Sequence, residues 1–207
     1  MWYISSKITL KIKDFLPKEI KKYQNDSLIM PFGDGPTYTS NPTYSLFLNM
    51  ISAAENRICI STPYFIIDKG FINAIVRALK SGIEVNILVP HIPDKKLIFY
   101  LTRGNYNEIL KAGGNIYEYS KGFNHAKNVF VDSKYAYIGT SNIDYRSLFL
   151  HFEDGVFITN DLSIVEMEKD FFDAINESEK ITYDKWKNRP WYEKVIAYLL
   201  IFFSPLF

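Results

Sequence analysis

The apolar run IEVNILVP, from Ile83 to Pro90, constrains the fold of this chain more than any other segment. Its side chains are mostly β-branched or otherwise apolar, which is typical of a strand in the interior of a sheet. Such a strand is covered on both of its faces. The run therefore predicts a largely buried sheet enclosed by helices.

Helix and strand patterns alternate before and after this run. A helix is predicted from Pro42, after the capping candidates Ser40 and Asn41, because apolar residues recur there at helical spacing. The same alternation continues to Tyr119, and it predicts a layered α/β domain. Its further elements are strands at Ile58–Thr62 and Ile116–Tyr119 and helices at Lys69–Lys80 and Tyr106–Ala112.

The second half of the chain predicts a hairpin. Strands are expected over Ala126–Val131 and Tyr135–Gly139, joined by Asp132-Ser133-Lys134, which has the length and composition of a tight turn. A strand at Phe152–Thr159 and a helix at Leu162–Ile175 follow. The predicted fold class is α/β, an α/β/α sandwich with a mixed sheet.

We predict three parts along the chain. Residues 1–38 are interpreted as a connector, since a turn-rich stretch ends them, and residues 39–180 as the folded domain. Residues 181–207 are expected to form an amphipathic tail, in which aromatic and basic residues precede VIAYLLIFFSPLF. That order suits a segment in a membrane interface. The alternative is a helix packed on the protein's own core or on a partner subunit.

Composition narrows the function. The formal net charge of +1 gives no support to a strongly electrostatic partner, so nucleic acid is not expected. A single cysteine, Cys59, excludes a disulfide within the chain and fits a reducing cytoplasm. The three histidines, His91, His125 and His151, form no cluster with zinc spacing, and neither a metal nor another cofactor is expected.

Polar groups suited to a phosphodiester are predicted to converge at one end of the hairpin. His125 and Lys127 are two residues apart at the start of its first strand, so they project to the same side. The returning strand brings Thr140 and Asn142 back toward them. Together these residues offer a nucleophile near neutral pKa, a cation and neutral donors.

Asp132 is expected to differ from these residues in its orientation. It lies an odd number of residues from His125 and from Lys127, so on a regular strand it faces away from both. It also occupies the turn, where an aspartate commonly accepts hydrogen bonds from backbone amides. The pattern favours a structural role for Asp132.

The string HAKNVFVDSKYAYIGTSNIDYRSLFLHFE, from His125 to Glu153, resembles the phospholipase D superfamily. The pattern of that superfamily is His-x-Lys-x4-Asp followed by Gly-[Ser/Thr]-x-Asn. The likeness is greatest to the C-terminal catalytic half of bacterial cardiolipin synthases, and TPYFIIDKGF, VPHIPDKK and KITYDKWKNRPWYEKV add to it. It extends from about Pro31 to Phe207 and implies a phospholipase D-like domain.

The resemblance implies roles for the motif residues. His125 would attack phosphorus and form a phosphohistidine, with Lys127 and Asp132 as the rest of the catalytic motif. Lys127 and Asn142 would bind phosphoryl oxygens, and Thr140 occupies the hydroxyl position of the phosphate site.

The sequence leaves alternatives open for other polar residues. Glu153 occupies the place of an acidic residue near the family's site and could orient an imidazole, with a solvated surface carboxylate as the alternative. Arg146 could hold an anionic lipid headgroup or pair with Asp144. His91 and His151 are interpreted as structural, because neither has a lysine two residues later.

The implied function is phosphatidyl transfer. One phosphatidylglycerol would donate its phosphatidyl group to His125 and release glycerol, and the hydroxyl of a second would attack the intermediate to give cardiolipin. The expected partners are phosphatidylglycerol and an anionic membrane surface. The expected location is peripheral, on the cytoplasmic side of the cell membrane.

The motif occurs once in this chain, whereas members of the resembled family use two facing motifs. The second could come from a homodimer mate or from a separate N-terminal half. Two other functions stay open: a homodimeric phosphodiesterase or nuclease, and an inactive truncated half.

Overall fold

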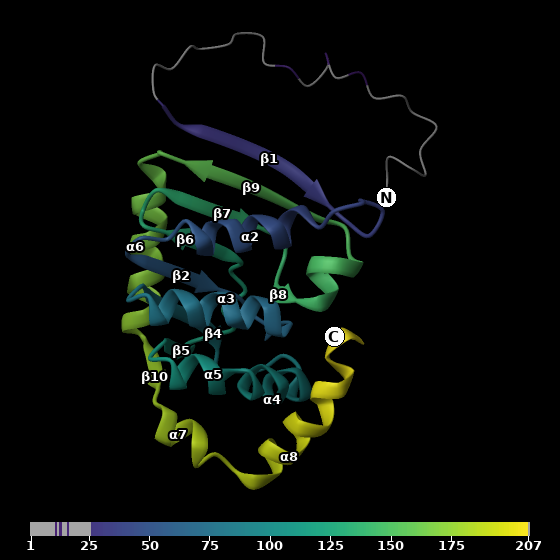
Figure 1. Ribbon diagram of the computed structural model, residues 1–207, viewed down its shortest axis with the longest axis vertical. Coiled ribbons are helices and arrows are strands. Elements are labelled where there is room, and N and C mark those ends of the chain that lie inside the picture. Colours follow the sequence, from purple (N-terminus) through teal and green to yellow (C-terminus); the bar gives the residue numbers. More distant parts are fainter. Residues whose placement is uncertain (1–10, 12, 14–15, 17–25, 207) are drawn as a thin grey trace.

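The computed structural model describes residues 11, 13, 16 and 26–206. Its main feature is an eight-stranded mixed sheet in the order β1-β9-β7-β6-β2-β4-β5-β10, with a short parallel pair, β3-β8, beside it (Figure 1). The strands are β1 (Leu28–Asp34), β2 (Arg57–Ser61), β3 (Phe65–Ile66), β4 (Glu84–Pro90), β5 (Asn115–Tyr119), β6 (Asn128–Val131), β7 (Tyr135–Gly139), β8 (Ile143–Asp144), β9 (Glu153–Thr159) and β10 (Ser178–Ile181).

Helices cover both faces of this sheet. The helices are α2 (Pro42–Ser52), α3 (Lys69–Lys80), α4 (Lys96–Gly104), α5 (Tyr106–Lys111), η2 (Arg146–Leu150), α6 (Ser163–Asn176), α7 (Tyr183–Lys187), α8 (Trp191–Leu200) and η3 (Ile201–Leu206). Side chains of α2, α3 and α5 build the larger hydrophobic core on one face, and α6 builds the smaller core on the other. The prediction of an α/β/α sandwich with a mixed sheet is confirmed.

The parallel strands β2, β4 and β5 lie at the centre of the sheet, and β4 is the run from which the fold was predicted. Six of its seven residues are buried, as an interior strand requires. Cys59 lies beside it on β2, fully buried and free. Burial raises the pKa of its thiol to about 12, and the carboxylate of Glu168 adds to that shift.

The interpretation of residues 1–38 as a connector is wrong for residues 28–34, because these form β1. The strand pairs with β9 along its whole length, from Leu28 opposite Thr159 to Asp34 opposite Glu153. The buried carboxylate of Asp34 then accepts the backbone N–H of Thr43 at 2.9 Å and joins β1 to the first turn of α2. Pro31 and Gly33 are uncommon in strands, so the sequence does not predict β1, although proline is tolerated on an edge strand.

Strand β10 and helix α4 are among the elements that the sequence prediction lacks. Strand β10 is short and polar, and it forms the opposite edge of the sheet by pairing with β5. Helix α4 begins without a side-chain cap at Lys95, so the usual start pattern is missing.

The C-terminal segment packs partly on the domain. The carboxylate of Glu193 on α8 is buried and lies 3.1 Å from the guanidinium of Arg103 on α4, and Ala197 of α8 is buried close to Gly104. The predicted alternative, packing on the protein's own core, is therefore correct for this side of α8. Its other side carries exposed aromatic and aliphatic residues. Within the residues described, no helix is long and apolar enough to cross a membrane.

Candidate active site

The predicted phosphodiester site lies at the carboxyl ends of the central parallel strands β2 and β4. At this end of the strands β6 begins and β7 ends, which brings the residues around His125 close to those around Thr140. The end of a parallel sheet is a usual place for a site, because the chain leaves it in loops that can carry polar groups.

His125 and Lys127 lie before β6, so the prediction that this strand begins at Ala126 is wrong by two residues. The Lys127 ammonium donates a hydrogen bond to the His125 carbonyl oxygen at 2.8 Å, and this bond holds the two residues together. The His125 ring is exposed and lies 5.4 Å from the ring of Phe123. It also lines an open cavity of about 400 Å³.

Asn124 fixes the segment that carries His125, and the sequence reasoning missed it. Its side-chain oxygen accepts the backbone N–H of Ala126 at 3.0 Å, and its amide nitrogen lies 3.4 Å from the hydroxyl oxygen of Ser61 at the end of β2. A side chain that binds its own backbone two residues on is typical of Asn in a turn. The imidazole is therefore anchored on the end of a central strand.

Thr140 and Glu153 form a pair across β7 and β9. The Thr140 hydroxyl donates to the Glu153 carboxylate and accepts the backbone N–H of Asp154 at 2.9 Å. The Glu153 side chain is only 10 % exposed, so the alternative of a solvated surface carboxylate is wrong. The imidazole that Glu153 approaches is that of His151, at 3.9 Å between Oε1 and Nδ1.

Glycines make the turn at Thr140 possible. Gly139 and Gly155 lie opposite each other on β7 and β9, and the ring of Tyr137 occupies the space above both. A β-carbon at Gly139 would lie 2.3 Å from the Tyr137 hydroxyl oxygen, and one at Gly155 would lie 2.4 Å from its ring. Any larger residue would displace Tyr137 and, with it, the strand end that carries Thr140.

The electrostatics favour a neutral imidazole at His125. Partial burial lowers its pKa, the neighbouring ammonium of Lys127 lowers it further, and the carboxylate of Asp94 opposes both effects. Asp94 follows β4 in a loop and accepts a hydrogen bond from the Tyr64 hydroxyl. Sequence reasoning missed both residues, because neither belongs to the motif.

Burial also lowers the pKa of Lys127. The carboxylates of Glu153 and Asp144 act in the opposite direction and favour the charged ammonium. Two carboxylates, one on β9 and one on β8, therefore favour the charged form of Lys127.

Asp132 and His125 lie at opposite ends of β6, because Asp132 follows the strand and His125 precedes it. Its carboxylate accepts the backbone N–H groups of Glu55, Asn56 and Arg57 at 2.7, 2.9 and 2.7 Å, where β2 begins. Asp132 and Ser133 have φ of +54° and +53°, a turn conformation that aspartate tolerates. Although the motif groups it with the catalytic residues, Asp132 contacts the start of β2 and not the site.

Replacing Asp132 with alanine is expected to lower the free energy of unfolding by about 2–4 kcal/mol, since three hydrogen bonds to a partly exposed carboxylate are lost. Burial opposes ionisation, but the three N–H donors outweigh it and lower the pKa of Asp132. Its stabilisation is thus present above the unfolded pKa of about 4 and is lost as pH falls through the lower folded pKa. Urea unfolding at several pH values measures this effect, with the exposed Asp173→Ala as control. Unchanged stability with lost activity would contradict the structural role.

Arg146 does not pair with Asp144, so that predicted alternative is wrong. The Arg146 guanidinium bonds Nε2 of His151, at 3.2 Å from Nε and 3.1 Å from Nη2. The Asp144 carboxylate instead accepts the backbone N–H of Ser147 at 2.7 Å. His91, predicted as structural, binds the buried carboxylate of Glu118 at 2.8 Å.

No three residues among His, Cys, Asp and Glu are arranged to hold a metal ion in the part of the chain that the structure describes. The groups present are an imidazole, an ammonium, carboxylates, a hydroxyl and an amide. They suit nucleophilic substitution at a phosphorus that already carries negative charge.

Known proteins are similar to this chain in sequence and in fold. A family model described as "Cardiolipin synthase, PLD-like domain" matches residues 47–175. Cardiolipin synthase of Halalkalibacterium halodurans is 35% identical over 205 residues, which is 99% of this chain and 41% of that protein. Cardiolipin synthase 2 of Bacillus anthracis is 40% identical over 172 residues, 83% of this chain and 34% of that protein. The chain thus spans less than half the length of these relatives.

Solved structures agree on the fold. Phosphatidylserine synthase of Haemophilus influenzae Rd KW20 aligns with a TM-score of 0.66 and 20% identity, over 90% of this chain and 47% of that one. Nuc of Salmonella typhimurium, a phospholipase D family member, aligns with a TM-score of 0.65 and 18% identity, over 76% of this chain and 99% of that one. The chain belongs to the cardiolipin synthase, PLD-like domain family of the phospholipase D superfamily, as its single motif predicts.

Proposed function

We propose that this chain provides one half of a phosphatidyl-transfer site that makes cardiolipin from two molecules of phosphatidylglycerol. The observation that carries the proposal is the exposed His125 imidazole, anchored beside Lys127 at the end of the central strands. In the first step an imidazole nitrogen bonds to phosphorus, the bond from phosphorus to the glycerol oxygen breaks, and that oxygen takes up a proton. In the second step the hydroxyl of another phosphatidylglycerol loses a proton, attacks phosphorus and frees His125.

The lowered pKa of His125 supports its role as nucleophile. An imidazole attacks only in its neutral form, and partial burial together with the Lys127 ammonium keeps it neutral near pH 7. Lys127 and the amide of Asn142 would hold the phosphoryl oxygens as charge grows on them. Thr140 would act through Glu153, because its hydroxyl proton is directed to that carboxylate.

The leaving glycerol oxygen needs a proton donor, and a second motif would provide it. The motif occurs once in this sequence, so the donor would come from a second copy of the chain or from a partner half. The exposure of His125 supports this arrangement, since a second histidine could approach it from solvent at the strand ends.

Labelled phosphatidylglycerol in vesicles tests the function. The purified chain, of known mass in solution, is expected to release glycerol and form cardiolipin, with a trapped phosphohistidine at His125. Phosphatidic acid alone would indicate a hydrolase. A homogeneous dimer with neither product nor adduct would refute a self-sufficient enzyme and leave the partner half to be supplied.

The rate of transfer is expected to fall as pH decreases through the pKa of His125, which lies below its ordinary value, because protonation removes the nucleophile. Asp94→Asn removes the negative charge that raises the pKa of His125. The acid limb of the pH profile should therefore move to lower pH in this variant, and the exposed Asp173→Asn should leave it unchanged. Titration of the His125 ring by NMR measures the same shift without turnover. A shift to higher pH would contradict the assigned electrostatics.

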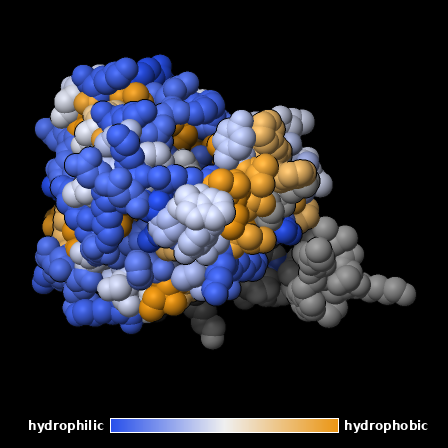
Figure 2. All heavy atoms as spheres, turned by 90° about the horizontal axis from the view of Figure 1, so that it is seen from below, coloured by the Kyte–Doolittle hydropathy of each residue, from blue (hydrophilic) through white to orange (hydrophobic). Residues whose placement is uncertain are grey.

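We further propose a peripheral location on the cytoplasmic side of the cell membrane. Figure 2 shows apolar side chains gathered over the C-terminal helices. Trp191 and Phe202 are 74 % and 73 % exposed, and aromatic rings of this kind favour the membrane interface. The apolar surface of α8 and η3 is formed by Trp191, Tyr192, Val195, Tyr198, Leu199, Ile201, Phe202 and Phe203.

The double variant Tyr198→Ser/Phe202→Ser is expected to lower binding to anionic vesicles about tenfold or more, because two exposed rings that lie 6.1 Å apart leave the apolar surface of α8 and η3. Vesicle flotation measures the bound fraction. The double variant Leu162→Ser/Val165→Ser removes exposed apolar residues from the start of α6 and is the matched control. Equal binding of both double variants would disprove docking through α8 and η3.

A further inference from the structure

A second cavity, of about 660 Å³, adjoins the proposed catalytic residues without including His125. Its wall contains Asn142, which is proposed to bind the phosphoryl group. It also contains Tyr64, whose hydroxyl donates to Asp94, the carboxylate that acts on the pKa of His125. A molecule in this cavity would lie next to the reacting centre.

The lining of this cavity is predominantly cationic. Lys95, Lys96 and Arg146 line it, and the only carboxylate in the lining is that of Asp144, which is buried and accepts the N–H of Ser147. None of the three cations forms an ion pair with any residue that the structure describes. Three cations gathered around one cavity without anionic partners favour an anionic ligand.

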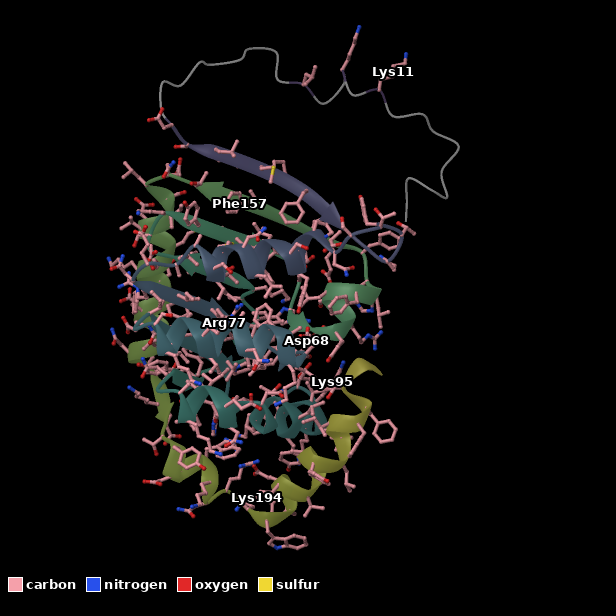
Figure 3. The ribbon with its side chains drawn as sticks, viewed as in Figure 1. Lys11, Asp68, Arg77, Lys95, Phe157 and Lys194 are labelled. Atoms are coloured by element: carbon pink, nitrogen blue, oxygen red, sulfur yellow. The ribbon has the colours of Figure 1, made fainter. Side chains whose placement is uncertain are left out.

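The first turn of α4 adds to this positive potential. Lys96, Leu97 and Ile98 at the start of this nine-residue helix line the cavity, and no side chain caps the helix at Lys95. The free N–H groups of such a helix end carry partial positive charge and bind phosphate readily. Figure 3 shows Lys95 on the right-hand side of the molecule, the side on which the C-terminal helices also run.

Two polar groups in the wall indicate more than a bare anion. The Arg146 guanidinium is oriented by Nε2 of His151, a bond that leaves its charge unneutralised. The side-chain oxygen of Asn142 is buried and accepts no hydrogen bond from the residues that the structure describes. An unpaired buried acceptor is satisfied by a donor such as a hydroxyl group.

We propose that this cavity is the acceptor site, which holds the phosphate and glycerol of the second phosphatidylglycerol. This inference rests on the proposed function. Lys95, Lys96 and Arg146 bind the acceptor phosphate together with the start of α4, and Asn142 orients the glycerol hydroxyl toward the phosphohistidine. The site selects a phosphate-bearing alcohol over water and over small neutral alcohols.

Competition between two acceptors tests this selection. Phosphatidylglycerol vesicles are incubated with the protein, and with its partner half if one is needed, in a fixed concentration of ethanol. Cardiolipin and phosphatidylethanol then form from one phosphohistidine, so their ratio does not depend on the folded fraction or on the donor step. Lys96→Gln/Arg146→Gln is expected to lower the ratio about tenfold or more, because ethanol needs no phosphate site.

The matched control is Arg77→Gln/Lys80→Gln, which removes the same charge from the exposed end of α3, far from Lys95 in Figure 3. This control should keep the wild-type ratio. An unchanged ratio in Lys96→Gln/Arg146→Gln overturns the acceptor site. An equal loss of both products also overturns it, because the cations would then act on the donor step.

Direct binding separates this inference from the proposed function. If the wild-type protein forms neither product, the function fails while the site is still measurable with soluble glycerol 3-phosphate by calorimetry. Wild type and Arg77→Gln/Lys80→Gln should bind it at least tenfold more tightly than Lys96→Gln/Arg146→Gln. Absence of binding to wild type overturns the site. Equally tight binding of inorganic phosphate overturns recognition of the glycerol.

Discussion

Replacing His125 with alanine is expected to reduce cardiolipin formation by about 10⁴-fold or more, because the two displacements lose their shared nucleophile. The phosphohistidine adduct should disappear with the activity. The imidazole is exposed, and its backbone carbonyl still accepts the Lys127 ammonium in the variant, so stability should change little. Turnover of labelled phosphatidylglycerol and urea unfolding, measured on the same sample, check both expectations.

A second histidine provides the matched control. His91→Ala removes an imidazole that binds Glu118 away from the motif, and it should cost stability with only a small change in turnover per folded molecule. If His125→Ala kept an adduct or more than about a hundredth of the wild-type rate, another residue would be the nucleophile. That result would refute the proposed mechanism while leaving the family assignment intact.

Replacing Glu118 with alanine is expected to lower the free energy of unfolding by about 3–5 kcal/mol, the usual cost of leaving a buried cation without its partner. Its fully buried carboxylate accepts two bonds from Arg103, at 2.9 and 2.7 Å, and a third from the Tyr106 hydroxyl at 3.2 Å. Arg103 also binds Glu193 of α8, and its carbonyl accepts the indole N–H of Trp186. The same substitution should therefore loosen the C-terminal helices from the domain.

Urea unfolding measures the stability, and limited proteolysis between α7 and α8 measures the loosening. Glu179→Ala is the control. Among the residues that the structure describes, this exposed carboxylate on β10 forms an ion pair with Lys185 alone, and it should contribute less than about 1 kcal/mol. If both variants had equal stability, the buried network would not hold the C-terminal segment in place.

The interior of the fold was predictable because the residues of each interior element carry the pattern of that element. The β4 run is mostly apolar. Helix α3 begins directly after Asp68, whose side chain caps it, and ends before Gly82. The edge strands β1 and β10 were not predictable, because pairing with β9 and with β5 determines their extended conformation rather than their own residues. Pro31 would break an interior strand, and only pairing with β9 makes residues 28–34 extended.

The same division applies to the candidate site. Adjacency in sequence identified His125 and Lys127, and strand parity predicted that Asp132 faces away from them. The alternation of side chains along a strand was applied to His125 and Lys127, which precede β6. It separated Asp132 from these two residues, but it wrongly placed Ala126 in the strand. Tyr64 reaches the site through the loop after β2, Asp94 through the loop after β4, and Lys96 at the uncapped start of α4. No local pattern marks such long-range proximity.

The buried thiol of Cys59 makes this chain suitable for site-specific labelling. A thiol with a pKa of about 12 inside the sheet is unreactive toward maleimides, so no residue needs to be removed first. A single cysteine introduced at Lys80 would then carry the only spin label in each copy. Distances between the labels would show whether two copies pair with their His125 sites facing each other or whether the second motif comes from a different chain.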